Sequence, residues 1–432
     1  MQIDPRDAPI TVAEVDLGVP GYAPAAGEPP TVAVRDTAVM ALARLHTHPL
    51  GVVGVHVPAG SDLRLCVRQA AHAQLAPEIA EHERRDQAGE GPSRNPVPPC
   101  LHARREASAA APLISVIIGT RERPAELARC LASLAAVDYP RFEVLVVDND
   151  PESDATRQVA EQAAGAVRYL CGKRRGVAVA HNLGAAEANG RILAFTDDDV
   201  VVDRNWLAAI AEGFADPRVG CVTGLIMPGE LDTREQAMLE RRGGYAKGFA
   251  QRIFETGADA GAAGGDRLFP FTAGRMGSGA NMAFDAGLLA QLHGFDPALG
   301  PGTVARAGED LLALFRAAAA GRRVVYQPDA LVWHHHKRDP GALKAQALGY
   351  GIGLGAYLTS ALVHEPRLVP AFLRLVPRGV GYALRRSHAD HDDPDAWPTR
   401  LAALERRGLV LGPAAYARSR WLTRHAQPDG SR

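Results

Sequence analysis

The chain has 432 residues, 47% of them hydrophobic, and a formal net charge of −1. This length allows a large core and more than one domain, and the balanced charge gives no global field that would favour nucleic acid as a partner. No basic segment followed by an apolar run opens the chain, and no stretch reaches about 18 uninterrupted apolar residues. We therefore expect no signal peptide, no membrane-spanning helix and a cytoplasmic protein.

The N-terminal part predicts a small accessory domain followed by a linker. Residues 1–30 are rich in Pro, Gly and Asp and lack periodicity, so they are expected to be irregular. Residues 31–86 combine short apolar runs with Ala-rich helical spacing from Leu63 to Glu83, which predicts a small α+β domain. Residues 87–111 are rich in Gly, Pro, Ser and Ala and are interpreted as the linker.

Potential metal ligands occur in this part, but their spacing does not predict a site. His46 and His48 are spaced like a ligand pair, yet no carboxylate or thiol lies near them in the sequence, so they are interpreted as turn residues. The cysteines form no Cys-x-x-Cys and no close pair, which predicts free thiols in a reducing compartment and argues against a structural zinc. These cysteines are Cys66, Cys100, Cys130, Cys171 and Cys221.

Residues 112–200 alternate the patterns of buried strands and helices. The expected strands are 113–118, 143–147, 167–170 and 192–195, and the expected helices between them are 124–134, 155–164 and 176–188. This order predicts a doubly wound α/β sheet with right-handed crossovers. Such sheets bind ligands at the carboxyl ends of their strands, where Thr120, Asp148 and Asp197 fall.

The last of these strands ends in three consecutive carboxylates, Asp197, Asp198 and Asp199. Two carboxylates one residue apart on an extended backbone point the same way and can share one hard divalent cation. Mg²⁺ or Mn²⁺ held in this way keeps positions open for the phosphates of a nucleotide. The alternative is an exposed acidic turn that caps the helix beginning near Asn205.

The rest of this region returns to the same end of the sheet. A further strand is expected over 221–226, and the Gly/Ala-rich stretch 257–265 is interpreted as part of a mobile acceptor-side segment. Gly308-Glu309-Asp310 opens a helix over 311–319. Strands are expected over 324–326 and 331–333, and the second runs into His334, His335 and His336.

From Pro112 to His336 the chain resembles the inverting, nucleotide-sugar-dependent glycosyltransferases of family 2, which have the GT-A fold. The resemblance rests on motifs that occur in the right order: Ile114 to Thr120, Phe142 to Asp150, Gly176 to Gly184, Thr196 to Asp199, Gly279 to Asn281, Gly308 to Asp310 and Val332 to His336. It implies a GT-A domain over 112–337, between the accessory domain and a helical, basic region over 338–432. It also implies transfer from an NDP-sugar donor (UDP-, GDP- or dTDP-linked) to a hydroxyl acceptor in cell-envelope glycoconjugate biosynthesis.

The resemblance assigns the metal and the base. Asp199 is implied as a direct ligand of Mn²⁺ or Mg²⁺, and Asp197 as lying near both the metal and the ribose. His334 or His336 is implied as completing the metal shell, although the histidine run can also be a solvated loop tip. Asp310 is implied as the general base with Glu309 beside it, although both can simply cap a helix.

Other residues are implied as contacts to the substrates. Thr120 and Arg121 would meet the nucleoside, Asp148 the base, and Asp198 and Asn182 the donor. Arg175, together with Lys173 and Arg174, would meet phosphate or lie in a solvated loop. Gly279 and Asn281 are implied on the acceptor side. The chain departs from the family at Leu311-Leu312, where many members have an acidic residue, and at His181, where many have Arg.

Two rival functions remain open. A nucleotidyltransferase of related fold shares the strand that runs into Gly119-Thr120-Arg121, but this chain lacks the fuller Gly-rich loop and the downstream Pro-Lys of those enzymes. A non-catalytic sugar-nucleotide-binding protein is the second rival, and the presence of Asp197, Asp199 and Asp310 argues against it.

The C-terminal region carries a possible membrane contact. Arg367, Arg374, Arg378 and Arg385 fall within roughly 20° of one another on a helix, which predicts a cationic stripe on an interfacial helix. Pro370 and Pro377 should kink or break that helix. The stripe predicts contact with an anionic membrane and a lipid-linked acceptor. Docking of the stripe on the catalytic domain is the alternative.

Overall fold

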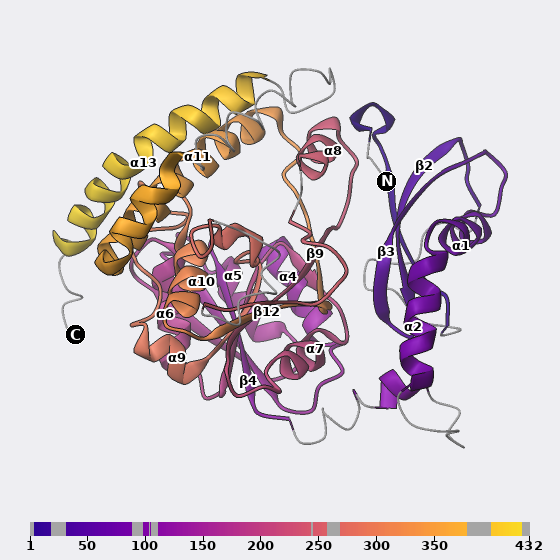
Figure 1. The fold of residues 1–432 in the computed structure, drawn as a ribbon, viewed down its shortest axis with the longest axis horizontal. Helices are drawn as coiled ribbons and strands as arrows, with labels where there is room; N and C mark the ends of the chain where they lie inside the picture. The colour runs from indigo at the N-terminus through magenta and orange to yellow at the C-terminus, as the bar shows by residue number, and fades with distance from the viewer. Residues whose placement is uncertain are drawn as a thin grey trace.

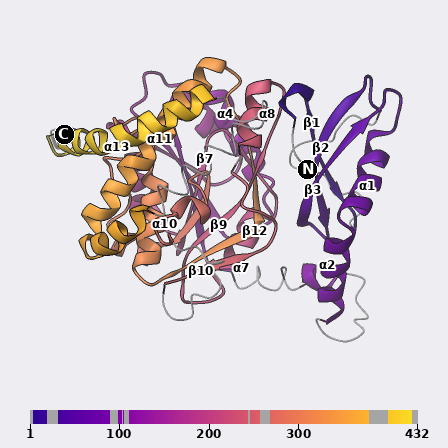
Figure 2. The ribbon, with the colours of Figure 1, turned by 45° about the horizontal axis from the view of Figure 1, so that its top comes forward.

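The structure is a computed structural model of the chain, and it describes residues 4–18, 32–88, 98–102, 104, 111–242, 245–256, 268–377 and 399–425. A central sheet flanked by helices separates a small N-terminal domain from a pair of long C-terminal helices (Figures 1 and 2). Among the described residues, no helix has the length and apolar content that a membrane span requires.

The N-terminal domain is a three-stranded sheet with two helices packed against it. The sheet has the order β1-β2-β3, with β1 parallel to β2 and β2 antiparallel to β3. The elements are η1 (Pro5–Asp7), β1 (Thr11–Asp16), β2 (Thr37–Leu45), β3 (His48–Val57), α1 (Leu63–Gln74) and α2 (Ala76–Ala88). Alternate residues of β2, such as Val39 and Ala41, meet Leu63 and Val67 of α1 in a core of their own.

Two expectations for this part were wrong in detail. The stretch 1–30 is not irregular throughout, because β1 lies within it. The acidic residues of β1 interrupt its apolar pattern, so the pattern did not predict a strand. One of them, Glu14, is buried, and there it makes an ion pair with Arg44. The single helix expected from Leu63 to Glu83 is two helices that meet at Leu75. Within the expected linker, residues 98–102 and 104 are described, and Arg104 makes ion pairs with Glu212 and Asp329 of the central-sheet domain.

The central sheet has nine strands in the order β10-β12-β9-β11-β7-β4-β5-β6, with β8 paired to β12. Strands β7, β4, β5 and β6 are parallel, and β11 is antiparallel to both of its neighbours. The strands are β4 (Ile114–Thr120), β5 (Phe142–Asn149), β6 (Val167–Gly172), β7 (Ile192–Asp197), β8 (Val200–Val202), β9 (Val219–Pro228), β10 (Arg252–Phe254), β11 (Asn281–Asp285) and β12 (Arg323–His334).

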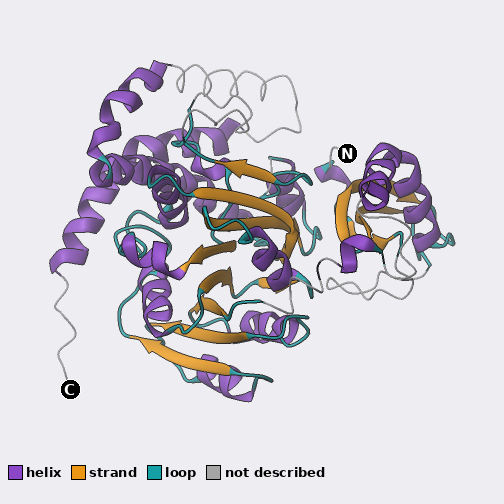
Figure 3. Ribbon diagram, turned by 60° about the horizontal axis from the view of Figure 1, so that its bottom comes forward, coloured by secondary structure: helices purple, strands orange, loops and turns teal. Residues whose placement is uncertain are grey.

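Helices cover both faces of this sheet (Figure 3). Alternate residues of one strand enter different cores: Val116 and Ile118 of β4 pack with α4 and α7, whereas Ile117 packs with α6. Burial on both faces explains why the strands read as nearly continuous apolar runs. The helices are α4 (Pro124–Leu134), α5 (Ala155–Gln162), α6 (Val177–Glu187), α7 (Trp206–Gly213), α8 (Arg234–Arg241), η3 (Ala273–Arg275), α9 (Ala286–Gln291) and α10 (Glu309–Ala319).

Strand β12 corrects one prediction. Two strands were expected over 324–326 and 331–333, but the structure has a single strand, Arg323–His334, with an irregular register between Gln327 and Leu331. Pro328 lies inside this irregular stretch, where a residue without an N–H is tolerated. The continuous strand ends at His334, which pairs with Val200 of β8.

Where the structure describes the C-terminal region, it is helical, as predicted, and two long helices pack closely there. These are α11 (Pro340–His364) and α13 (Thr399–His425), with η4 (Pro366–Leu368) after the first. Gly355 of α11 faces Gly412 of α13, and a Cβ on Gly355 would lie 2.4 Å from the carbonyl oxygen of Leu409. The close approach of the two backbones therefore requires glycine at these positions.

The N-terminal domain is joined to the central sheet by buried charges. Arg44 of β2 is 1% exposed and makes ion pairs with Glu14 and with Asp203, the latter at 2.7 Å. Asp203 follows β8, so this pair crosses the domain boundary. Burial raises the pKa of Glu14 to about 7, although the charge of Arg44 opposes the rise.

Arg44→Met should lower the free energy of unfolding by about 3–5 kcal/mol, because it removes the ion-pair partner of two buried carboxylates, Glu14 and Asp203. Urea denaturation of the full chain measures this loss, and Arg35→Met, an exposed arginine of the same domain, is the matched control. A loss below about 1 kcal/mol, the range of exposed pairs, would contradict the assignment.

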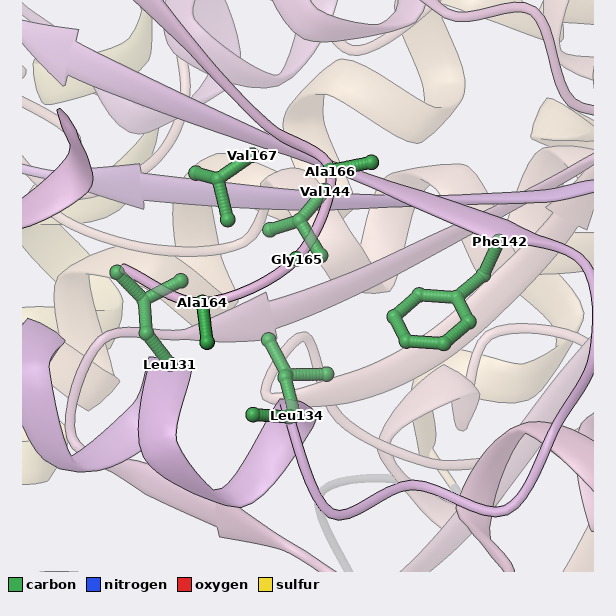
Figure 4. Close-up of a pocket in the computed structure, with 9 residues that line it drawn as sticks. Leu131, Leu134, Phe142, Val144, Ala164, Gly165, Ala166 and Val167 are labelled. Atoms are coloured by element: carbon green, nitrogen blue, oxygen red, sulfur yellow. The ribbon is translucent and has the colours of Figure 1, made fainter. Parts of the chain in front are cut away.

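An apolar cavity of about 230 Å³ lies between α4, the start of β5 and the segment 164–167 (Figure 4). Leu131, Leu134, Phe142 and Val144 line it, and no charged side chain does. Phe142 and Val144 begin β5, so the cavity lies at the amino ends of the parallel strands. It is therefore at the opposite end of the sheet from Asp197, which ends the parallel strand β7.

Candidate active site

Asp197, Asp199 and His334 converge at the carboxyl end of β7. Strand β8 follows Asp199 directly and runs antiparallel to β12, pairing Val200 with His334. The backbone N–H of His335 donates to the carbonyl of Asp199 at 3.0 Å. As a result, one ligand atom from each of the three side chains lies within 4.8 Å of the others. We call these three residues the acidic cluster.

The two carboxylates of the acidic cluster have opposite electrostatic properties. Burial, and then the negative charge of Asp199, raise the pKa of Asp197 to about 7. Burial alone would raise the pKa of Asp199 as well, but the contact with His334 and the charge of Arg123 hold it below its usual range. Burial lowers the pKa of His334, and the neighbouring Asp199 reverses this and raises it.

The donor set of the acidic cluster fits a divalent cation. Oδ1 of Asp199 faces Nε2 of His334 at 3.3 Å without a well-formed hydrogen bond, and it has no other partner although it is buried. Buried polar atoms normally have a partner, so this oxygen and the Asp197 carboxylate beside it are suited to a cation. Carboxylate and imidazole donors together suit Mn²⁺ or Mg²⁺ better than a thiophilic metal.

The three consecutive histidines have different positions. Of the three, only His334 lies beside Asp197 and Asp199. His336 is 4% exposed, and its Nδ1 lies 3.2 Å from Nδ1 of His334 while its Nε2 faces Glu240 at 3.5 Å. His335 points elsewhere, toward Glu230 at 3.6 Å. The predicted ligand His336 therefore lies behind His334, where it can orient that ring.

Asp198 turns away from the acidic cluster. Its carboxylate accepts a hydrogen bond from Thr120 Oγ1 at 2.7 Å and another from Arg123, whose other terminal nitrogen donates to Asp199 at 2.8 Å. Burial raises the pKa of Asp198 to about 6, against the charge of Arg123. Arg123 was missed at the sequence level. Its position just before the proline that opens α4 was the one available signal.

Asp148, the last residue but one of β5, has one carboxylate oxygen unpaired. Oδ2 accepts from the Tyr169 hydroxyl at 2.9 Å, while Oδ1 is buried without a hydrogen-bond partner. Burial raises the pKa of Asp148, and the Tyr169 hydrogen bond opposes this. A buried acceptor without a donor is expected to bind an N–H of a ligand.

Asp310 is held at the start of α10. Its Oδ2 accepts from the Gly279 N–H at 2.8 Å and its Oδ1 from the Leu311 N–H at 2.7 Å. Gly308, with φ of 101°, is the N-cap that turns the chain into α10. Burial raises the pKa of Asp310, and the Gly279 hydrogen bond opposes this.

Glu309 and Asp310 point to different places. Glu309 is buried against the turn at Gly300, and its Oε2 has no hydrogen-bond partner. Burial, followed by the charge of Asp310, raises the pKa of Glu309 well above its usual value. Repulsion from Asp310 also contributes to the raised pKa of Asp197, which places Asp310 within electrostatic reach of the acidic cluster.

Four predicted site residues have other partners or lie apart. Asn281 donates to the carbonyls of Leu225 and Ala330 and accepts from Trp206, which occupies its amide group. The Asn182 amide is likewise held by the backbone of Phe295 at 2.8 and 2.9 Å. The remaining two are Arg121, which contacts the Asp150 carbonyl and Glu152, and Arg175, which is exposed before α6.

Comparison with known proteins identifies part of the chain. Residues 115–273 match the family described as glycosyl transferase family 2. The chain is 34% identical over 102 residues to glycosyltransferase AglE of Haloferax volcanii, covering 22% of this chain and 33% of AglE. It is 26% identical over 313 residues to the pre-mycofactocin glycosyltransferase of Mycobacterium tuberculosis, covering 72% of this chain and 57% of that protein. The chain thus spans less than two thirds of either relative.

Among solved structures, the chain is similar to the mannosyltransferase PcManGT of Pyrobaculum calidifontis in complex with GDP-Man and Mn²⁺. The two are 21% identical, the alignment covers 83% of this chain and 97% of that one, and the TM-score is 0.45. The topology and the family match confirm the predicted fold class, an α/β GT-A domain between a small N-terminal domain and a helical C-terminal region. Residues 115–273 therefore match a glycosyl transferase family 2 domain, and the matched stretch includes Thr120, Asp148 and Asp197 to Asp199.

Proposed function

We propose that the chain transfers a sugar from an NDP-sugar to a hydroxyl acceptor with inversion, assisted by Mn²⁺ or Mg²⁺. The observation that carries the proposal is the convergence of Asp197, Asp199 and His334 at the carboxyl end of β7, with ligand atoms within 4.8 Å of one another. Asp310 lies within electrostatic reach of this cluster, as a base beside a donor site should.

The chain's own residues supply the remaining chemistry. Asp310 would accept the proton of the acceptor hydroxyl, and hydrogen bonds from the N–H groups of Gly279 and Leu311 fix its two oxygens. Asp197, Asp199 and His334 would hold the cation, which neutralises the charge of the departing diphosphate when bound. His336 and Glu240 would keep the His334 ring in place.

The donor's nucleoside would lie over the ends of β4 and β5. The unpaired Oδ1 of Asp148 supports an N–H contact to the base, and Thr120 and Asp198 lie at the neighbouring strand ends. Arg123, 37% of whose side chain is exposed, already neutralises Asp198 and Asp199. It is the cation best placed to contact phosphate, ahead of the exposed Arg175.

A donor-hydrolysis assay tests this function against both rivals. UDP-, GDP- and dTDP-sugars are incubated with the protein and Mn²⁺, and the released nucleotide is identified. A glycosyltransferase releases the nucleoside diphosphate, whereas a nucleotidyltransferase forms the triphosphate when pyrophosphate is added. If the protein only binds sugar nucleotides, one donor would protect the protein against thermal unfolding and no nucleotide would be released, which would contradict the proposal.

The acceptor is unidentified, and a lipid-linked one is favoured by an exposed face of α13. Val410 is 79% exposed and Trp421 is 58% exposed, and at about 100° per residue these positions share one helix face. Arginines flank this face at Arg406, Arg407, Arg418 and Arg424. A basic helix that exposes Trp and Val is typical of a membrane surface contact.

The stripe predicted around residue 370 is only partly described. Arg367 and Arg374 are exposed, whereas Arg378 and Arg385, like the stretch 257–265, lie outside the described residues. The apolar side of this segment packs on the catalytic core, where the rings of Phe372 and Phe271 are 5.1 Å apart. The segment thus packs through its apolar side and not through the arginine stripe, so both predictions for the stripe stay open, and α13 is the helix that we propose for membrane contact.

The full chain should therefore sediment with anionic vesicles and less so as salt is raised. Val410→Ser combined with Trp421→Ser should weaken this binding several-fold, because it removes the apolar part of the contact. Leu65→Ser, which changes an exposed leucine of α1, is the control. Equal binding to neutral and anionic vesicles, or none to either, would contradict membrane contact through this helix.

A further inference from the structure

A second group of metal-ligating side chains lies in the N-terminal domain, far from the acidic cluster in the sequence. It consists of His46, His82, Asp86 and Cys100. His46 comes from the β2–β3 turn, and His82 and Asp86 are one turn apart on α2. Cys100 comes from the helical turn that begins at Pro98. The interpretation of His46 as a turn residue without a carboxylate or thiol partner was incomplete, because its partners lie 40 and 54 residues away.

The four ligand atoms lie close to one another. Oδ2 of Asp86 is 3.0 Å from Nδ1 of His46, 3.5 Å from Nε2 of His82 and 3.2 Å from Sγ of Cys100. The Cys100 sulfur is 3.6 Å from the same His46 nitrogen and 3.8 Å from the His82 nitrogen. Each side chain therefore presents one donor atom to a common centre.

These separations match the edges of a tetrahedral metal site. Zinc bound at about 2.0 Å to nitrogen and about 2.3 Å to sulfur places neighbouring ligand atoms about 3.3–3.6 Å apart. The measured separations of 3.0–3.8 Å bracket this range. A thiolate, two imidazoles and one carboxylate form a closed ligand set for zinc, and the thiolate disfavours Mn²⁺ and Mg²⁺.

Hydrogen bonds alone account poorly for the arrangement. Three potential donors, on His46, His82 and Cys100, converge on the single oxygen Oδ2 of Asp86. A carboxylate oxygen has about two lone pairs to offer, so the three cannot all donate well to it. A cation at the common centre would instead use one lone pair from each of the four atoms.

The turn that carries His46 is held in an uncommon conformation. His46 has φ of 52° and Thr47 has φ of 69°, and positive φ is rare for a β-branched residue. Contacts from outside the turn support it, because the Thr47 N–H donates to Asp16 at 2.7 Å and its hydroxyl accepts from Arg104 at 3.0 Å. Such local strain is commonly found where a side chain must be positioned for a ligand.

We propose that His46, His82, Asp86 and Cys100 bind one structural zinc ion. The site would fasten the turn at Pro98 to α2 and to the β2–β3 turn. Arg104, four residues after Cys100, is 6% exposed and contacts Glu212 and Asp329 of the catalytic domain. The zinc would thus hold Arg104 at the domain boundary. This proposal does not depend on the proposed sugar transfer.

Metal content of the purified full chain tests the site directly. Wild type and Cys66→Ser, which changes the cysteine of α1, should each retain about one zinc ion per chain after gel filtration, as a closed four-ligand site does. Cys100→Ser and His82→Gln should lose it. Cobalt exchanged for zinc should give a thiolate-to-cobalt charge-transfer band in wild type and in Cys66→Ser, and none in Cys100→Ser.

The cobalt band separates this site from the acidic cluster, which has no thiol among its ligand atoms. Because the band is measured on wild type, the test does not depend on whether a variant folds. Wild type without the band, or Cys100→Ser with it, would overturn the proposal.

Discussion

Asp199→Ala should abolish sugar transfer while leaving the fold intact. Asp199 is the residue of the acidic cluster whose pKa is lowered, so it carries a full negative charge toward the cation. Removing it takes away a ligand and several kcal/mol of charge stabilisation, which at about 1.36 kcal/mol per decade is roughly a thousandfold or more in rate. The measurement is nucleoside diphosphate release at increasing Mn²⁺ concentrations.

Two comparisons sharpen this test. Asp154→Ala, which changes an exposed carboxylate before α5 that makes no side-chain cap hydrogen bond, should keep wild-type activity and metal dependence. The melting temperature of Asp199→Ala should remain near that of wild type, which separates loss of chemistry from loss of fold. Wild-type activity that is the same with excess chelator as with Mn²⁺ would refute the assignment of the acidic cluster as a metal site.

Asp310→Asn should lower kcat by roughly a thousandfold and leave nucleotide affinity nearly unchanged. Loss of a general base typically costs about 10² to 10⁴ in rate, and Asp310, the proposed base, is positioned by hydrogen bonds from the N–H groups of Gly279 and Leu311. The amide keeps the size of the carboxyl group but cannot accept a proton at neutral pH. Turnover and the Kd for the nucleoside diphosphate are measured separately.

The pH profile provides a second readout for Asp310. Burial raises the pKa of this carboxyl, so the base is protonated and inactive at low pH and kcat should rise as pH climbs through the raised pKa. This limb should disappear in Asp310→Asn and persist in Glu161→Gln, an exposed carboxylate variant on α5. A loss of nucleotide binding as large as the loss of kcat would instead place Asp310 at the donor.

The strands and helices of the catalytic domain were predictable because local signals agree there. Val116 and Ile118 belong to a strand buried on both faces, and Pro124 begins α4 at the residue expected. β1 was not predictable, because Glu14 and Asp16 break its apolar pattern. Glu14 is buried beside Arg44, and Asp16 accepts hydrogen bonds from the N–H groups of Gly18 and Thr47. The local sequence around a charged residue does not show whether a countercharge far away in the chain will allow that residue to be buried.

The candidate site likewise contains features that the sequence predicted and features that it did not. Asp197 and Asp199 could be paired from the sequence, since residues two apart on an extended chain face the same way. The sequence could not show which histidine of the run lies beside the two carboxylates, because this depends on how β12 pairs with β8. Arg123 was missed because no periodicity marks a side chain that folds back over a strand end.

By itself the sequence determined the strand and helix order, the strand ends that carry Thr120, Asp148 and Asp197, and the likeness to a glycosyltransferase. These follow from short-range periodicity and from residues adjacent in the chain. Only the tertiary structure decided that His334 joins the carboxylates, that Asp148 keeps a free oxygen, and that the scattered His46 and Cys100 meet. Such contacts join residues far apart in the sequence, so they depend on strand register and domain docking, which no local pattern encodes.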